Sequence, residues 1–275
     1  HFSLGNGTYQ AVVYGHPVHY QDENGTWQDI DNTLTLQTVN GTQQYTNDRV
    51  AFAPTYRANA QLMRLQKGDY SISMSLISNA SASTMSTTNI SSSNAAVTNA
   101  NKQIASIDQA MNASWSSNVK YENVLTNVDP EYIVDYDYVK ENIIVKAPRA
   151  SYDFSFRLNL EGMYAALLSD GSVGIYSNET NAMEYAIPTP YMYDASGRFS
   201  DEVTYSLAGA SGKYVLTVSA DEAWMEEEDR AFPVTIDPTY TTTRVSLDHT
   251  YTATYSPSTP QVSPSVLWVS ADETT

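Results

Sequence analysis

The stretch YSISMSLI, residues 70–77, alternates large apolar side chains with serines. Successive side chains of a β-strand point to opposite faces, so Ile72, Met74 and Leu76 would share one face and the serines the other. A strand of this kind buries one face and leaves the other in water, which is typical of antiparallel sheets. The stretch therefore predicts a half-buried strand next to an apolar core.

The same pattern continues on both sides of this stretch, interrupted by turn signals. Asn24-Gly25 supplies the two positive-φ positions of a tight hairpin turn, and Thr26–Ile30 follows as the returning strand. Further strand-like segments are Tyr9–Tyr14, Pro17–Tyr20, Arg49–Ala53, Gln61–Gln66, Val119–Leu125, Glu131–Asp135, Glu141–Lys146, Tyr152–Leu160, Ala165–Leu168, Val173–Tyr176, Met183–Ile187, Val203–Leu207 and Tyr214–Val218. We expect an all-β fold, an antiparallel β-sandwich built as one large sandwich or as two packed ones.

The apolar positions of these segments predict the core. It should contain Val12, Val18, Trp27, Ile30, Ile72, Met74, Leu76, Ile133, Ile144, Phe154, Phe156, Leu158, Ile175, Leu216, Val218, Trp224, Phe232, Val234 and Ile236.

Residues 78–118 interrupt the β pattern with a polar, nearly uncharged stretch rich in Ser, Thr, Asn and Ala. One interpretation is a low-complexity linker. The other is a short helix over Asn94–Asn112, because Val97, Ala100, Ile104, Ile107 and Met111 recur at spacings of three and four residues. In both cases we expect the insert to be dispensable for the core. Residues 1–239 would then form the sandwich module, and residues 240–275 the truncated start of a second β domain.

Composition limits the partners and the compartment. The 275 residues carry a formal net charge of −17 and no cysteine, which argues against nucleic acid as a partner and excludes disulfides and thiolate metal sites. No apolar run is long enough to span a membrane, so we expect no membrane insertion. The first residues resemble no export signal and the last follow a strand-like run, so both ends look like cuts in a longer polypeptide.

Clusters of residues that could carry chemistry have simpler explanations. His16 and His19 would point to opposite faces of a strand and therefore could not share a metal. Asp135 with Asp137, and the acidic run 226–229, could be imagined as a glycosidase pair, but neighbouring acids are ordinarily solvated turn residues. The segment 194–202 loosely resembles a calcium loop, although a hairpin turn explains the same residues. We expect no catalytic residue, no metal and no cofactor.

Several segments together resemble a known bacterial family. They are Tyr9–Tyr14 with Pro17–Tyr20 and Asp22–Leu34, then Lys67–Ser73, Tyr121–Leu125, Val139–Val145, Ile187–Ala195 and, most specifically, Trp224–Thr239. Together they resemble the N-terminal region of RHS-repeat (YD-repeat) and related wall-associated proteins of Firmicutes. Asp248–Tyr251 and Ser265–Val269 are similar to the start of a DNRLRE-type domain.

The resemblance implies a non-enzymatic structural or scaffolding module of a large protein that is secreted or associated with the cell wall. Its partner would be the rest of the same polypeptide, a downstream repeat region. The alternative is a carbohydrate-binding or adhesion module for cell-surface polysaccharide, with a glycan-active enzyme as the third choice. Because sugars stack on aromatic rings, the candidate glycan-binding residues are Tyr191, Tyr193 and Trp268.

Overall fold

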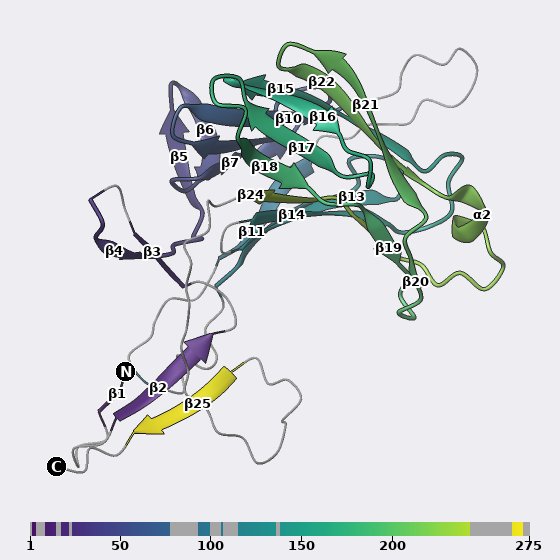
Figure 1. The fold of residues 1–275 in the computed structure, drawn as a ribbon. Helices are drawn as coiled ribbons and strands as arrows, with labels where there is room; N and C mark the ends of the chain where they lie inside the picture. The colour runs from purple at the N-terminus through teal and green to yellow at the C-terminus, as the bar shows by residue number, and fades with distance from the viewer. Residues whose placement is uncertain are drawn as a thin grey trace.

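The protein is an all-β structure in which two large antiparallel sheets pack face to face (Figure 1). The computed structural model describes residues 2–3, 9–14, 18–21, 24–77, 93–99, 106, 115–135, 138–242 and 266–271. Phe52 of one sheet and Tyr132 of the other meet across the interface with ring centroids 5.4 Å apart. The predicted antiparallel β-sandwich is confirmed.

The first large sheet has eight strands. In spatial order they are β21 (Val203–Ala210), β22 (Lys213–Ala220), β15 (Asp153–Glu161), β10 (Tyr70–Leu76), β9 (Met63–Lys67), β7 (Val50–Phe52), β6 (Thr42–Thr46) and β5 (Thr35–Val39). All their pairings are antiparallel.

The second large sheet has twelve strands. Its main path runs β16 (Met163–Leu167), β17 (Val173–Ser177), β18 (Met183–Ile187), β24 (Thr239–Thr242), β14 (Tyr138–Val145), β13 (Val128–Asp135), β12 (Ser117–Tyr121), β11 (Ser93–Thr98) and β8 (Thr55–Tyr56). Three strands leave this path, namely β23 (Val234–Asp237), which pairs with β14, then β19 (Tyr191–Tyr193) and β20 (Phe199–Ser200). Residues 191–200 therefore form a small hairpin at one end of the sheet.

Smaller elements complete the described structure. The strand β2 (Tyr9–Tyr14) lies between β1 (Phe2–Ser3) and β25 (Val266–Ala271), and β3 (His19–Gln21) pairs with β4 (Trp27–Asp29). The short helix α2 (Glu222–Met225) is capped by Asp221, whose carboxylate accepts the N–H of Trp224 at 2.7 Å. Among the described residues, no helix is long and apolar enough to cross a membrane.

Strand β10 lies where the alternating stretch 70–77 predicts it, with β9 on one side and β15 on the other. Ile72 and Met74 are fully buried in the core shared by the two sheets. Most of the other predicted core residues are buried too, namely Ile30, Leu76, Phe154, Phe156, Leu158, Ile175, Leu216, Val218, Val234 and Ile236. In the strands that contain these residues, the alternation identifies the inner face.

The remaining predicted core residues are exposed or only partly buried. Trp27 is 54% exposed on a two-stranded ribbon, which offers no second layer to cover it. Ile133 and Ile144 are only partly buried, because strand parity sends Tyr132, Val134, Ile143 and Val145 inward instead. Others that remain partly exposed are Val12, Val18, Trp224 and Phe232.

The helical interpretation of Asn94–Asn112 is wrong for its first turn. Residues 93–98 form strand β11, in which Val97 pairs with Val119 and packs against the core. The side-chain amide of Asn99 then pairs with the backbone of Leu34 as a neighbouring strand would. Its Oδ1 accepts the N–H of Leu34 at 2.9 Å, and its Nδ2 donates to the Leu34 carbonyl at 3.0 Å. Ala100, Ile104, Ile107 and Met111 lie outside the described residues. The insert 78–118 therefore contributes β11 and the first residues of β12 to the sheet, and the expectation that it is dispensable for the core does not hold for residues 93–98.

Phe156 tests the shared core. It is 1% exposed and pairs with Leu76 on one side and Leu216 on the other, so Phe156→Ala should lower the free energy of unfolding by about 3–5 kcal/mol. Leu36→Ala is the matched control, because Leu36 lies 50% exposed on the edge strand β5 and should cost less than about 0.5 kcal/mol. Urea unfolding followed by circular dichroism measures both. Equal losses would contradict a single core built from both sheets.

Candidate functional site

The densest group of charged and aromatic side chains lies at the β19–β20 corner. We use this name for the hairpin 191–202, the segment 221–231 that follows β22, and the adjoining strands β14 and β23. Three features meet there: an ion-pair cluster, a row of stacked rings and a buried carboxyl group. Each is produced by residues from different parts of the chain.

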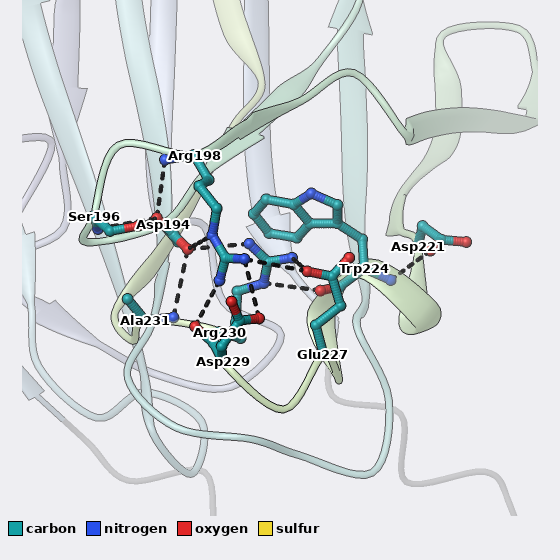
Figure 2. Close-up of polar contacts among 9 residues, drawn as sticks. All are labelled: Asp194, Ser196, Arg198, Asp221, Trp224, Glu227, Asp229, Arg230 and Ala231. Carbon is teal, nitrogen blue, oxygen red and sulfur yellow. Dashed lines mark hydrogen bonds and ion pairs between the residues drawn. The ribbon is translucent and has the colours of Figure 1, made fainter.

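Asp194 is the centre of the ion-pair cluster (Figure 2). One carboxylate oxygen closes the turn 194–198 by accepting the N–H groups of Ser196 and Arg198, at 2.9 and 3.0 Å, and the Ser196 hydroxyl at 2.6 Å. The other oxygen accepts Nε of Arg198 and Nη1 of Arg230, both at 3.0 Å. The side chains of Asp194 and Arg230 are almost completely buried. The carboxylate therefore ties the hairpin to the segment after α2.

Further charges surround both arginines. Arg198 lies 3.1 Å from the carboxylate of Asp229, and Arg230 lies 2.8 Å from that of Glu227. The Arg230 guanidinium also covers the Trp224 ring, 3.2 Å from its centroid, and its Nε donates to the Trp224 carbonyl. Burial on its own would raise the pKa of Asp194, but the hydrogen bonds from Ser196, Arg198 and Ala231 hold it well below its usual range. Asp194 is consequently ionised throughout the physiological pH range.

Three aromatic rings lie in a row on the outer face of the hairpin. Tyr191 is stacked on Phe199, with ring centroids 5.4 Å apart and a 29° angle between the planes, and on Tyr193 at 6.4 Å and 28°. Met192 points the other way, into the core. Phe199 is 62% exposed, the largest exposed fraction of any large apolar side chain in the described structure. We call Tyr191, Tyr193 and Phe199 the aromatic platform.

A lysine joins the platform to a buried carboxylate. Nζ of Lys140 lies 2.6 Å from Asp237 and 3.2 Å from the Tyr191 hydroxyl, and it covers the Tyr191 ring at 5.6 Å from the centroid. Burial would lower the pKa of Lys140, but the hydrogen bond and charge of Asp237 outweigh it and raise this pKa. Lys140 therefore remains cationic, and the central ring of the platform, Tyr191, lies against an ion pair.

Glu141, the next residue on β14, points into the core between the sheets. The Tyr132 hydroxyl donates to its Oε1 at 2.6 Å, while Oε2 has no hydrogen-bond partner among the described residues. Burial raises the pKa of Glu141 to about 8; the bond from Tyr132 opposes this shift and the charge of Asp237 adds to it. Glu141 is thus mostly protonated near neutral pH, which explains how a carboxyl group can stay in an apolar core.

The structure brings some of the candidate residues from the sequence together at this corner and places others elsewhere. Tyr191 and Tyr193 are partly exposed and form two thirds of the platform, whereas the side chain of Trp268 lies outside the described residues. The 194–202 segment is a hairpin turn in which Asp194 binds arginines. His19 bonds Asp29 at 2.8 Å, Asp135 accepts the Tyr138 hydroxyl, and His16 and Asp137 lie outside the described residues. In the described part of the chain, no cluster of three or more His, Cys, Asp or Glu could hold a metal.

Sequence reasoning missed Phe199, Arg198, Arg230 and Lys140. Lys140 and Asp237 are 97 positions apart, and Asp194 and Arg230 are 36 apart, so only the strand pairing brings them together. Phe199 could have been found, because a hairpin closing at Gly197 places it opposite Tyr193.

Comparisons with known proteins identify nucleases as relatives. The chain is 25% identical over 255 residues to the tRNA3(Ser)-specific nuclease WapA of Bacillus spizizenii and to the tRNA(Glu)-specific nuclease WapA of Bacillus subtilis subsp. natto. The same figures hold for the tRNA nuclease WapA of Bacillus subtilis. The matched region covers 89% of this chain but only 10% of each relative. No family model and no solved structure matches.

These findings overturn several expectations from the sequence. The resemblance to RHS-repeat and wall-associated proteins followed by a DNRLRE-type domain is wrong, because the relatives are tRNA nucleases and no family model matches. The same names contradict a non-enzymatic scaffold, a polysaccharide-binding or adhesion module, and the exclusion of nucleic acid as a partner. The charge argument failed because the acidity of a segment one tenth as long as its relatives does not describe a whole nuclease.

The ion-pair cluster should stabilise the fold through the charge of Asp194. Asp194→Asn keeps the shape of the side chain but removes the charge that faces buried Arg230, so unfolding should become easier by about 3 kcal/mol at pH 7. The contribution is present above the unfolded-state pKa of aspartate and disappears as the pH falls through the lowered folded pKa. Urea unfolding at neutral and acidic pH measures it.

Asp170→Asn is the control. Asp170 closes the turn 170–172 in the same way, accepting the N–H and hydroxyl of Ser172 at 3.0 and 2.6 Å, but no arginine of the described residues pairs with it. Its replacement should cost far less than that of Asp194. If both variants lost the same stability, the turn and not the arginine pairing would be responsible.

Glu141 should make the fold less stable as the pH rises. Its folded pKa of about 8 lies above the ordinary value of 4.5, so the folded protein keeps a proton that the unfolded chain releases. Stability should therefore fall between these two pH values, by at most about 1.4 kcal/mol per pH unit, and then level off. Glu141→Gln removes the titration, so its stability relative to the parent should increase from pH 5 to pH 8. Glu122→Gln, in an exposed turn, is the control; a constant difference for Glu141→Gln would refute the assignment.

Proposed function

We propose that this chain is a segment of a tRNA nuclease. The observation that carries the proposal is the match of 255 residues, 89% of the chain, to proteins named as tRNA nucleases. Because the match covers a tenth of those relatives, the proposed activity belongs to the whole polypeptide, with tRNA as its substrate. The secreted or wall-associated location expected from the sequence remains part of this proposal, since no relative's name states a location.

We further propose that the segment supplies a part shared by nucleases that cleave different tRNAs. One relative is named for tRNA3(Ser) and another for tRNA(Glu), yet both match this chain at 25% identity over the same length. A region that occurs in nucleases named for different tRNAs is available to both, whichever tRNA each cleaves. The equal match supports a role common to both.

A domain exchange tests both statements. The matched region of the tRNA(Glu)-specific relative would be replaced by this chain, and cleavage of individual tRNAs would be followed by northern blotting. The chimaera should still cleave tRNA(Glu) and leave tRNA3(Ser) intact. The same exchange in the tRNA3(Ser)-specific relative is the matched control, and it should keep its own substrate.

Two results would overturn the proposal. A change of tRNA preference on exchange would show that this segment selects the substrate. If the natural polypeptide containing this chain were purified and cleaved no tRNA from a total tRNA pool, the nuclease assignment itself would fail.

A further inference from the structure

We propose that the β19–β20 corner binds an arginine-bearing, basic protein surface, namely the tRNA-binding part of the same nuclease. This inference rests on the proposed function only for the identity of the partner. The surface itself is carried by two independent features, the exposed aromatic platform and the charge around it.

The aromatic platform exposes an apolar surface, chiefly at Phe199, while Tyr191 and Tyr193 are partly buried. Phe199 is 62% exposed, although transferring a phenylalanine side chain out of water lowers the free energy. Its ring continues the row formed by Tyr191 and Tyr193, so a partner would meet three rings held at fixed spacing. Figure 1 shows the β19–β20 hairpin projecting at the edge of the molecule, beside α2. A flat group on a partner could therefore reach the platform.

The charge beside the platform selects a cationic partner. The segments 194–202 and 221–230 contain two arginines, Arg198 and Arg230, and nine carboxylates: Asp194, Asp201, Glu202, Asp221, Glu222, Glu226, Glu227, Glu228 and Asp229. Eight of the carboxylate residues are exposed, while Asp194 and Arg230 are buried together. Both arginines already bind carboxylates within the corner. Phosphate groups of RNA would be repelled here, whereas a guanidinium would be attracted.

Arginine suits this combination of rings and carboxylates. Its planar guanidinium can stack on an aromatic face while its N–H groups bind carboxylate oxygens. The protein uses this arrangement internally, because Arg230 covers Trp224 and binds both Asp194 and Glu227 (Figure 2). An arginine from outside would find Phe199 in place of Trp224 and the exposed acids in place of Glu227.

A tRNA nuclease needs cationic side chains to bind the phosphate backbone of its substrate. Such a surface would carry the positive charge that is complementary to the corner, and arginine is one of the two residues that supply it. While the two surfaces are in contact, tRNA would be excluded from the basic one. The corner would then restrain the nuclease until the contact opens.

The first test measures binding by residues 1–275 to a labelled nine-residue peptide of alternating arginine and glycine, using fluorescence anisotropy at low salt. Phe199→Ala should weaken binding about threefold to fivefold, the loss expected for an exposed cation–π contact. Leu167→Ala, 46% exposed on β16 of the same sheet, is the matched control and should bind like the parent. Circular dichroism would verify that both variants are folded.

Three results of this titration would overturn the inference: equal binding by Phe199→Ala and the parent, equal binding of a lysine–glycine peptide, or displacement of the arginine peptide by single-stranded RNA. The first two would reveal simple attraction between opposite charges. The third would make the platform an RNA-binding surface.

The second test uses the full polypeptide. Phe199→Ala combined with Glu226→Gln and Glu228→Gln should increase the rate of tRNA cleavage, because the restraining contact is weakened. An unchanged rate would overturn the intramolecular partner. If neither the unmodified polypeptide nor the triple variant cleaved tRNA, the proposed nuclease function would fail, and the peptide titration would still decide whether the corner binds an arginine-bearing surface.

Discussion

Each large sheet must bury one face against the other, and this constraint determines which side chains of β14, β19 and β23 face the candidate site. Residues of β14 illustrate it, because Val139, Glu141 and Ile143 point into the shared core while Lys140 points outward to Asp237 and Tyr191. A shift of register by one residue would exchange these faces and place Lys140 in the core. Which side chains of β14 lie on the outer surface of the corner therefore follows from which of its residues are buried in the core.

Local alternation was sufficient to predict the fold class but not every buried residue. In β10 only one face is apolar, so the sequence alone was enough to assign the side chains of Ile72 and Met74 to the core-facing side of the strand. In β13 and β14 both faces carry apolar residues, and Ile133 and Ile144 were assigned to the wrong one. Residues 94–98 fit both a helical and a strand period, and pairing with β12 and β8 decided the outcome. Tertiary pairing resolves what a short pattern leaves ambiguous.

The candidate site was less predictable, since its contacts join distant segments. Nothing near Asp194 in the sequence indicates that Arg230 will bind it, and the same oxygen-rich turn can suggest a calcium loop. Composition also misled the functional interpretation, because a net charge of −17 describes this segment and not the far longer relatives that it matches.

Strand β24 has a consequence for the order in which the chain folds. Residues 239–242 lie between β18 and β14, in the middle of the twelve-stranded sheet. A polypeptide emerging from its N-terminus would expose the facing edges of β14 and β18 until these late residues arrive. Completion of the sheet must then wait for a contact of long sequence separation, which slows folding and leaves a period in which the open edges could pair with other chains. Synthesis of β24 thus sets the earliest time at which the twelve-stranded sheet can close.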